Sequence, residues 1–200
     1  MYSVSKTFDI AYAHRLLLDY PSKCSNLHGH NGTISVNICT PKVNENGMVL
    51  DCTIFKEILD KTIISKYDHA TLINIADEEL FNFCKKMNSK FVVIFNNTTS
   101  ENIAKSMWID IATELKKLKK NRNITLPGLK EAILTIEFNE SGNNLATFSD
   151  LICNPEINFE SLEKNKKENV NKTINKRKVI INNMDENEEE FKIVRIYKID

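Results

Sequence analysis

The chain has 200 residues, of which 42% are hydrophobic and 27% are charged. Its 27 basic residues balance its 27 acidic residues, so the bulk charge gives no reason to expect nucleic acid or an anionic membrane as a partner. No apolar run approaches the ~20 residues of a membrane span, and the first residues lack the apolar core of a signal peptide. We therefore expect a cytoplasmic protein that binds neither nucleic acid nor membrane.

The first two predicted elements are β-strands joined by a polar loop. Residues 2–14 alternate between apolar and polar side chains, and this alternation places His14 on the apolar face of the strand. Turn-forming residues dominate the loop over 15–27. Residues 28–39 predict a second strand, on which two further histidines share one face with the apolar side chains.

Helices and a buried strand are predicted for the middle of the chain. Residues 53–66 have apolar side chains at helical spacing, with Thr53 as the N-cap. A short apolar run at 91–95 indicates a buried strand. The pair Thr98 and Glu101 then matches a capping box, with Thr98 as the cap, and begins an amphipathic second helix.

The last strand of the globular part covers residues 130–140 and places Glu140 on its apolar face. This order of elements predicts an α+β fold. Lys, Asn and Glu dominate the composition beyond about residue 154, as in a solvated segment. We therefore divide the chain into a domain at 1–153 and a polar C-terminal extension at 154–200, in which residues 191–199 either add an edge strand or stay mobile.

Three of the four histidines have the spacing of a metal site. His28 and His30 are separated by one residue, so both imidazoles lie on the same side of a strand. His14 ends the preceding strand and would reach them if the two strands pair in antiparallel fashion. Three histidines with an open fourth position are the ligand set of a catalytic zinc site. The competing interpretation is a chance histidine pair in a satisfied polar patch.

Other groups could act on a substrate. Cys24, in the loop before His28, could be a nucleophile or general base, a fourth zinc ligand, or an idle thiol. Asp68 could orient His69, although an Asp-His dipeptide alone carries little information. Glu140 on a buried-facing register needs a partner, which a planar heterocycle with two parallel N–H donors would provide. A solvated glutamate at a strand end is the competing interpretation.

The order and spacing of these residues resemble a known family. The segment Cys24-Ser-Asn-Leu-His28-Gly-His30 resembles the Cys-x-x-x-His-Gly-His signature of the 6-pyruvoyltetrahydropterin synthase superfamily, and in particular its 6-carboxytetrahydropterin synthase branch. Further segments resemble family motifs in the same order between about residues 8 and 150. These segments are residues 11–16, 47–51, 68–72, 99–104 and 140–144.

The resemblance implies a T-fold, in which an antiparallel four-stranded sheet packs two helices on one face. It also implies homo-oligomers, commonly hexamers, with active sites at subunit interfaces. The implied substrate is 7,8-dihydroneopterin triphosphate, converted to 6-carboxy-5,6,7,8-tetrahydropterin on the route to queuosine and other 7-deazaguanines. The implied roles are zinc (Zn2+) binding by His14, His28 and His30, proton transfer by Cys24, Asp68 and His69, and pterin binding by Glu140 and Thr99.

Two alternative functions remain at this point. The first is a 6-pyruvoyltetrahydropterin synthase, which eliminates triphosphate without losing two carbons; the three-residue gap between Cys24 and His28 favours the carboxy branch. The second is a zinc-stabilised module that binds a pterin without turnover. The chain also departs from the family pattern at Ile10, which replaces an aromatic residue, and at Ile73, Thr98 and Ser141, which replace Asn, Pro and Thr.

Overall fold

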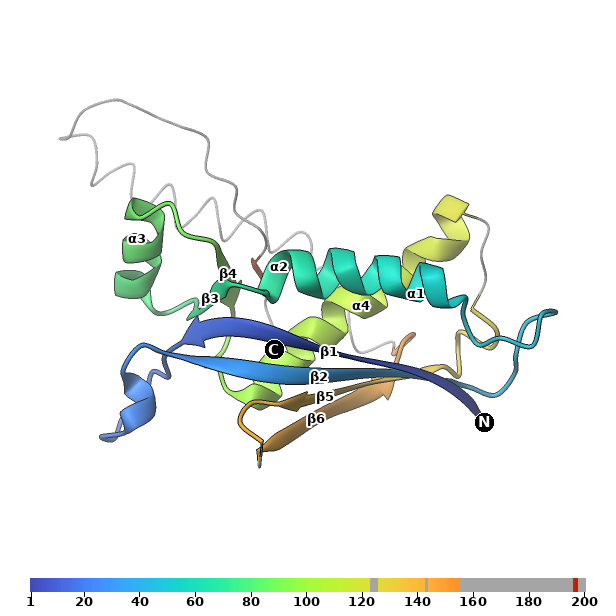
Figure 1. The fold of residues 1–200 in the computed structure, drawn as a ribbon, viewed down its shortest axis with the longest axis horizontal. Helices are drawn as coiled ribbons and strands as arrows, with labels where there is room; N and C mark the ends of the chain where they lie inside the picture. The colour runs from blue at the N-terminus through green and yellow to red at the C-terminus, as the bar shows by residue number, and fades with distance from the viewer. Residues whose placement is uncertain (123–125, 143, 155–195, 198–200) are drawn as a thin grey trace, which may run out of the picture.

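The strands of the protein form a single mixed sheet. The computed structural model describes residues 1–122, 126–142, 144–154 and 196–197 (Figure 1). Within them, seven strands follow the order β6-β5-β2-β1-β3-β4-β7. The antiparallel half consists of β1 (Tyr2–His14), β2 (His28–Thr40), β5 (Ile133–Asn139) and β6 (Leu145–Leu151). The parallel half consists of β3 (Ala70–Asn74), β4 (Phe91–Ile94) and β7 (Ile196–Tyr197).

The expected four-stranded antiparallel sheet is therefore confirmed only in part. The strands expected at 2–14, 28–39 and 130–140 do form three of its members. The strand expected at 91–95 instead belongs to the parallel half, because β4 pairs with β3 and not with the antiparallel strands. The fourth antiparallel strand is β6, which the sequence analysis did not predict. Its outer side chains face away from the core, so its apolar alternation is weak.

The first long helical segment agrees with the helix expected at 53–66. It comprises α1 (Cys52–Leu59), one turn of π-helix, η2 (Asp60–Ile64), and α2 (Ser65–Tyr67). Its N-cap is Asp51 and not Thr53, because the Asp51 carboxylate accepts hydrogen bonds from the amides of Thr53 (2.8 Å) and Ile54 (3.2 Å). Thr53 is already inside the first turn, where its own amide needs a partner.

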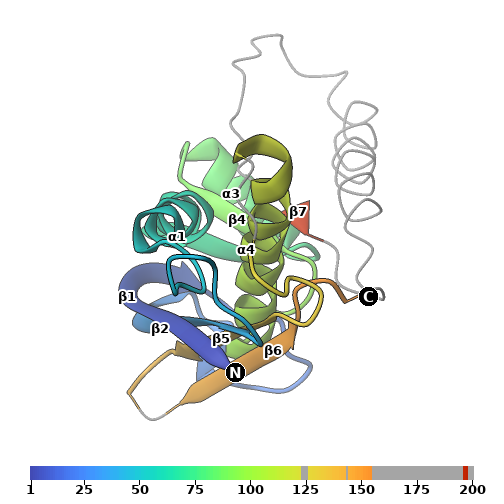
Figure 2. The ribbon, with the colours of Figure 1, turned by 90° about the vertical axis from the view of Figure 1, so that its right-hand side faces the viewer.

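The second long helix, α4 (Ser100–Arg122), begins one residue later than the capping box indicated. The amide of Ile103 donates to the carbonyl of Thr99, whereas the hydroxyl of Thr98 donates to the carbonyl of Arg15. The prediction that Thr98 is the N-cap was therefore wrong. The helical hydrogen bonds begin one residue later, and the Thr98 hydroxyl binds the loop after β1. Figures 1 and 2 show α1 and α4 on the same face of the sheet. Trp108 of α4 is fully buried in the main core.

A third helix, α3 (Glu78–Lys86), was not predicted. It packs Leu80 and Cys84 against Ile73 of β3, whereas the neighbouring Leu72 faces the main core. The parallel strands are therefore buried on both faces, which explains the continuous apolar run of β4. Only two residues of α3 are buried, so its apolar periodicity is too short to recognise.

The chain beyond residue 154 lies mostly outside the described residues. Of the strand expected at 191–199, Ile196–Tyr197 pairs in parallel with β4. The division into a domain at 1–153 and an extension at 154–200 remains a prediction. Among the helices that the structure describes, none combines the length and the apolar character needed to cross a bilayer.

Candidate metal centre and substrate pocket

The ladder between β1 and β2 brings the three histidines together. His14 lies directly opposite His28, and Tyr12 lies opposite His30, so alternate residues of both strands place all three imidazoles on the helix-covered face. The ring centroids are 4.7 Å apart for His14 and His28, 5.2 Å for His14 and His30, and 4.9 Å for His28 and His30. One nitrogen from each ring lies within 4.8 Å of the other two. Among the described residues, this is the one group with the geometry to hold a metal ion.

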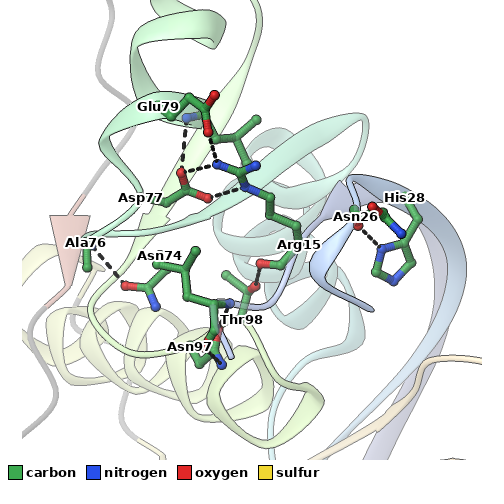
Figure 3. A network of polar contacts seen from close by, with 11 residues as sticks. Arg15, Asn26, His28, Asn74, Ala76, Asp77, Glu79, Asn97 and Thr98 are labelled. Carbon is green, nitrogen blue, oxygen red and sulfur yellow. Dashed lines mark hydrogen bonds and ion pairs between the residues drawn. The ribbon is translucent and has the colours of Figure 1, made fainter. Parts of the chain in front are cut away.

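Backbone carbonyls orient two of the three rings. Nδ1 of His14 lies 2.8 Å from the carbonyl oxygen of Thr98. Nδ1 of His28 lies 2.7 Å from the carbonyl oxygen of Asn26, a contact that Figure 3 shows. A carbonyl oxygen can only accept, so both Nδ1 atoms carry the proton. The lone pairs of these two rings are therefore on Nε2, the arrangement that a ligating histidine requires.

The buried ring of His14 shows that these residues fit a cation. His14 is 2% exposed, and its Nε2 atom has no hydrogen-bond partner among the described residues. Burial lowers the pKa of His14, so the ring is held in the neutral form that binds metals. A buried acceptor without a partner costs free energy. A divalent cation shared with His28 and His30 would satisfy this atom.

The histidines open into a pocket of about 560 Å³. Several of the expected site residues line it, from separate parts of the chain: Cys24, Thr99 and Glu140. Cys24 belongs to a short 3-10 turn, η1 (Lys23–Ser25), and its carbonyl accepts a hydrogen bond from the amide of Leu16. Cys24 is exposed and does not belong to the group of clustered donor atoms, although it shares the pocket with them.

Glu140 is not a solvated strand-end glutamate. β5 ends at Asn139, and the side chain of Glu140, 18% exposed, lies between the histidines and Tyr12. Its Oε1 atom accepts a hydrogen bond of 2.7 Å from the Tyr12 hydroxyl. The same atom lies 3.5 Å from Nε2 of His14 and 3.8 Å from Nε2 of His30. Burial raises the pKa of Tyr12, and Glu140 raises it further, so this hydroxyl stays protonated and donates.

The Asp68–His69 pair lies outside the pocket of its own chain. It follows α2, and His69 has a φ of +55°, a conformation that side-chain-bearing residues rarely adopt. Asp68 accepts hydrogen bonds from the amide of Ala11 (2.9 Å) and from Nδ1 of His69 (2.9 Å). Burial alone would raise the pKa of Asp68, but these two partners, together with the charge of Lys90, lower it overall. The His69 side chain is 79% exposed.

An ion-pair network supports the strand that carries His14. Arg15 donates two hydrogen bonds of 2.7 Å to the buried carboxylate of Asp77 and one of 2.9 Å to the exposed Glu79 (Figure 3). The hydroxyl of Thr98 donates to the Arg15 carbonyl, while the Thr98 carbonyl contacts His14. Thr98 therefore fixes the orientation of the His14 ring, and the contact with Arg15 fixes Thr98 in turn.

Tyr12, Thr98 and Arg15 are parts of the site that were not predicted from the sequence. Tyr12 shares the strand face of His14, and this parity was the signal that could have found it. The contacts of Thr98 and Arg15 join residues that are 62 to 84 positions apart, so no local sequence pattern predicts them.

Solved structures of 6-pyruvoyl tetrahydropterin synthases share this fold. The enzyme of Plasmodium vivax superposes with a TM-score of 0.54 at 17% sequence identity, over 76% of this chain and 99% of the other. At this level of identity the likeness establishes the fold alone. Together with the histidine cluster, it defines a T-fold protein with a candidate metal centre.

Sequence comparison identifies the family. A family profile described as 6-pyruvoyl tetrahydropterin synthase matches residues 3–150, and the chain therefore belongs to that family, as its motifs predicted. The 6-carboxy-5,6,7,8-tetrahydropterin synthase of Rickettsia conorii is 28% identical over 131 residues, which is 65% of this chain and 92% of the relative. The 6-pyruvoyl tetrahydrobiopterin synthase of Drosophila melanogaster is 34% identical over 104 residues, 50% of this chain and 52% of the relative.

Proposed function

We propose that this chain is a zinc-dependent 6-carboxy-5,6,7,8-tetrahydropterin synthase. It would convert 7,8-dihydroneopterin triphosphate into 6-carboxytetrahydropterin and release acetaldehyde and triphosphate, in a route to 7-deazaguanines such as queuosine. The observation that carries this proposal is the cluster of three imidazoles facing one pocket, which Cys24 and Glu140 also line. The name of the Rickettsia relative, matched over 92% of its length, supports the reaction type.

Each pocket residue has a role that its chemistry suits. Zinc held by the histidines would supply a Lewis acid that polarises the side-chain oxygens of the substrate. The Cys24 thiolate would remove a proton from the carbon beside the ring. The Glu140 carboxylate would accept the two parallel N–H donors of the pterin. Thr99, at the start of α4, would contact the ring from the adjacent wall.

Replacing Cys24 with alanine tests this assignment. We expect turnover to fall by a factor of about 10² to 10⁴, the usual contribution of a positioned proton-transfer group. Zinc content and melting temperature should stay unchanged, because Cys24 is outside the cluster of donor atoms. The measurements are product identification by mass spectrometry after incubation with 7,8-dihydroneopterin triphosphate, and metal analysis of the same samples.

The matched control is Cys52→Ala, since Cys52 is also an exposed thiol and lies at the start of α1. It should leave turnover intact. Loss of zinc from Cys24→Ala would instead indicate a closed structural site. A zinc-loaded wild-type protein that leaves the substrate untouched would refute the enzymatic proposal.

A second candidate reaction is that of a 6-pyruvoyltetrahydropterin synthase. The Drosophila relative, at 34% identity, favours it. The two reactions start from the same substrate but give different products. Mass spectrometry separates them, because only the carboxy reaction yields acetaldehyde and a shortened side chain.

We further infer that the chain acts as a homo-oligomer, and we expect a hexamer. The support is that Asp68 and His69 lie outside the pocket of their own chain, with the ring of His69 exposed. The pair would then complete the pocket of a neighbouring subunit, where His69, oriented by Asp68, transfers a proton.

Mixing two inactive variants tests this arrangement. Cys24→Ala and His69→Ala should each be inactive alone, but mixed oligomers formed by co-expression should regain activity. About one quarter of the interfaces in a random equal mixture would combine an intact Cys24 with an intact His69 from the neighbour. Activity near the level of either parent would contradict the shared site, provided that mass spectrometry shows that the subunits have mixed.

A further inference from the structure

One oxygen atom of Glu140 is held between two different kinds of partner. Oε1 accepts the Tyr12 hydroxyl at 2.7 Å, and it lies 3.5 Å and 3.8 Å from the Nε2 atoms of His14 and His30. It is nevertheless not a member of the metal-binding group, whose donor atoms all lie within 4.8 Å of one another. The carboxylate is therefore beside the histidine cluster but not part of it.

This position creates a conflict for Glu140. A divalent cation attracts a carboxylate, and carboxylate oxygens bind zinc at about 2.0–2.2 Å. If the Glu140 side chain turned towards the three histidines, Oε1 would therefore act as a fourth ligand in the position left for a substrate. That position would then be closed to a substrate, and the carboxylate would have one oxygen fewer with which to accept the donors of a pterin ring.

Tyr12 has the rigidity to prevent this rotation. Its ring is 5% exposed and packs against Phe138 and His30, with centroid distances of 5.6 Å and 5.7 Å. Its backbone belongs to β1, which is paired with β2 on one side and β3 on the other. A hydrogen bond from a hydroxyl to a carboxylate is about twice as strong as one between neutral groups.

We propose that Tyr12 is a positioning residue whose hydroxyl holds the Glu140 carboxylate away from the three-histidine centre and towards the substrate. The pterin part of this inference rests on the proposed function. The metal part depends only on the residues of this chain. Tyr12 therefore keeps the fourth coordination position open in the resting protein.

The variant Tyr12→Phe removes the hydroxyl and keeps the ring. We expect its zinc dissociation constant, measured by competition with a chromophoric chelator, to fall about tenfold, in the range of effects caused by changes next to metal ligands. The dissociation constant for 7,8-dihydroneopterin, which has the pterin ring without the triphosphate, should rise about tenfold. In steady-state kinetics KM should rise more than kcat falls, since the loss is one of substrate binding.

Two controls separate this role from a structural one. Tyr67→Phe is matched, because the Tyr67 hydroxyl is also buried and donates to a carboxylate, that of Asp110, on a different part of the fold. It should leave zinc and pterin affinities unchanged. The double variant Tyr12→Phe/Glu140→Gln should lose the tighter zinc binding, because a neutral amide is a poor zinc ligand.

The outcomes are distinct. Zinc and pterin affinities of Tyr12→Phe that both stay within twofold of wild type would overturn the inference. Tighter zinc binding that persists in the double variant would also overturn it, since Glu140 would then not be the added ligand. A wild-type protein that binds zinc but no dihydroneopterin would overturn the proposed function, while tighter zinc binding in Tyr12→Phe would still support the held carboxylate.

Discussion

Replacing His28 with alanine is expected to abolish stoichiometric zinc binding and turnover together. His28 supplies one of only three clustered donor atoms among the described residues, so its loss leaves a two-ligand site. We expect zinc affinity to fall by more than the 10- to 100-fold that changes next to a ligand cause. His28 is half-buried, whereas His14 is fully buried, so this substitution disturbs packing less than His14→Ala.

Thermal unfolding with and without a chelator gives a second readout. Zinc at a thousand times its dissociation constant stabilises a protein by about 4 kcal/mol, and His28→Ala should lose this metal-dependent shift. The control is His69→Ala, whose exposed ring lies outside the cluster and whose zinc content should match wild type. A His28→Ala protein that retains one zinc per chain would show that the three histidines are not the binding site.

Replacing Asp77 with asparagine is expected to cause the largest loss of stability. Asp77 is 3% exposed and receives both hydrogen bonds of the Arg15 fork. It also caps α3 by accepting from the amide of Leu80. Asparagine caps helices as well as aspartate does, so the substitution isolates the ion pair. Because the Arg15 side chain is 24% exposed, we expect a loss of about 1.5–3 kcal/mol, the contribution of a hydrogen bond to a charged group, which urea denaturation will measure.

The pH dependence of this loss has a defined sign. The Arg15 guanidinium, together with the Leu80 amide, holds the pKa of Asp77 below its ordinary value despite burial. The stability that the Asp77 carboxylate adds is therefore complete above the pKa of an unfolded aspartate, about 4. It is lost as the pH falls through the lower folded value. The difference between wild type and Asp77→Asn should shrink at acidic pH.

Glu79→Gln is the matched control for this pair. Glu79 contacts the same guanidinium, but its side chain is 86% exposed. Exposed ion pairs contribute about 0–1 kcal/mol, so this variant should unfold close to wild type. Equal losses for the two substitutions would contradict the view that burial makes the Asp77 contact strong.

The sequence predicted the elements whose side chains alternate strongly. β1 buries every second residue from Ile10 to His14, and β2 does so from Gly32 to Thr40; this alternation also placed His14 on the right face. β3 was missed because Thr71 and Asn74 interrupt its sequence, so that it lacks the continuous apolar run that marked β4. α3 was missed because it buries only two side chains. The predicted caps at Thr53 and Thr98 were wrong because Asp51 caps the first helix two residues earlier, and because the helical hydrogen bonds of α4 begin at the carbonyl of Thr99.

The candidate site also has parts that the sequence predicts and parts that it does not. The histidine cluster followed from a two-residue spacing on one strand and a neighbour at the end of another. The contact between Tyr12 and Glu140 joins residues 128 positions apart, so only the folded sheet reveals it. The position of Asp68 and His69 outside the pocket depends on the turn after α2, whose left-handed residue is a histidine and not the glycine that usually marks such a turn.

The pairing of His14 with His28 has a consequence for how the chain selects its strand alignment. The thirteen residues between β1 and β2 form too long a connection to dictate alignment as a tight turn does. A shift of two residues would preserve the inward and outward faces, so hydrophobic burial discriminates against it only weakly. Such a shift would displace His14 by about 7 Å along its neighbour. A higher refolding yield in the presence of zinc than in its absence would therefore show that the ion favours the native alignment of β1 and β2.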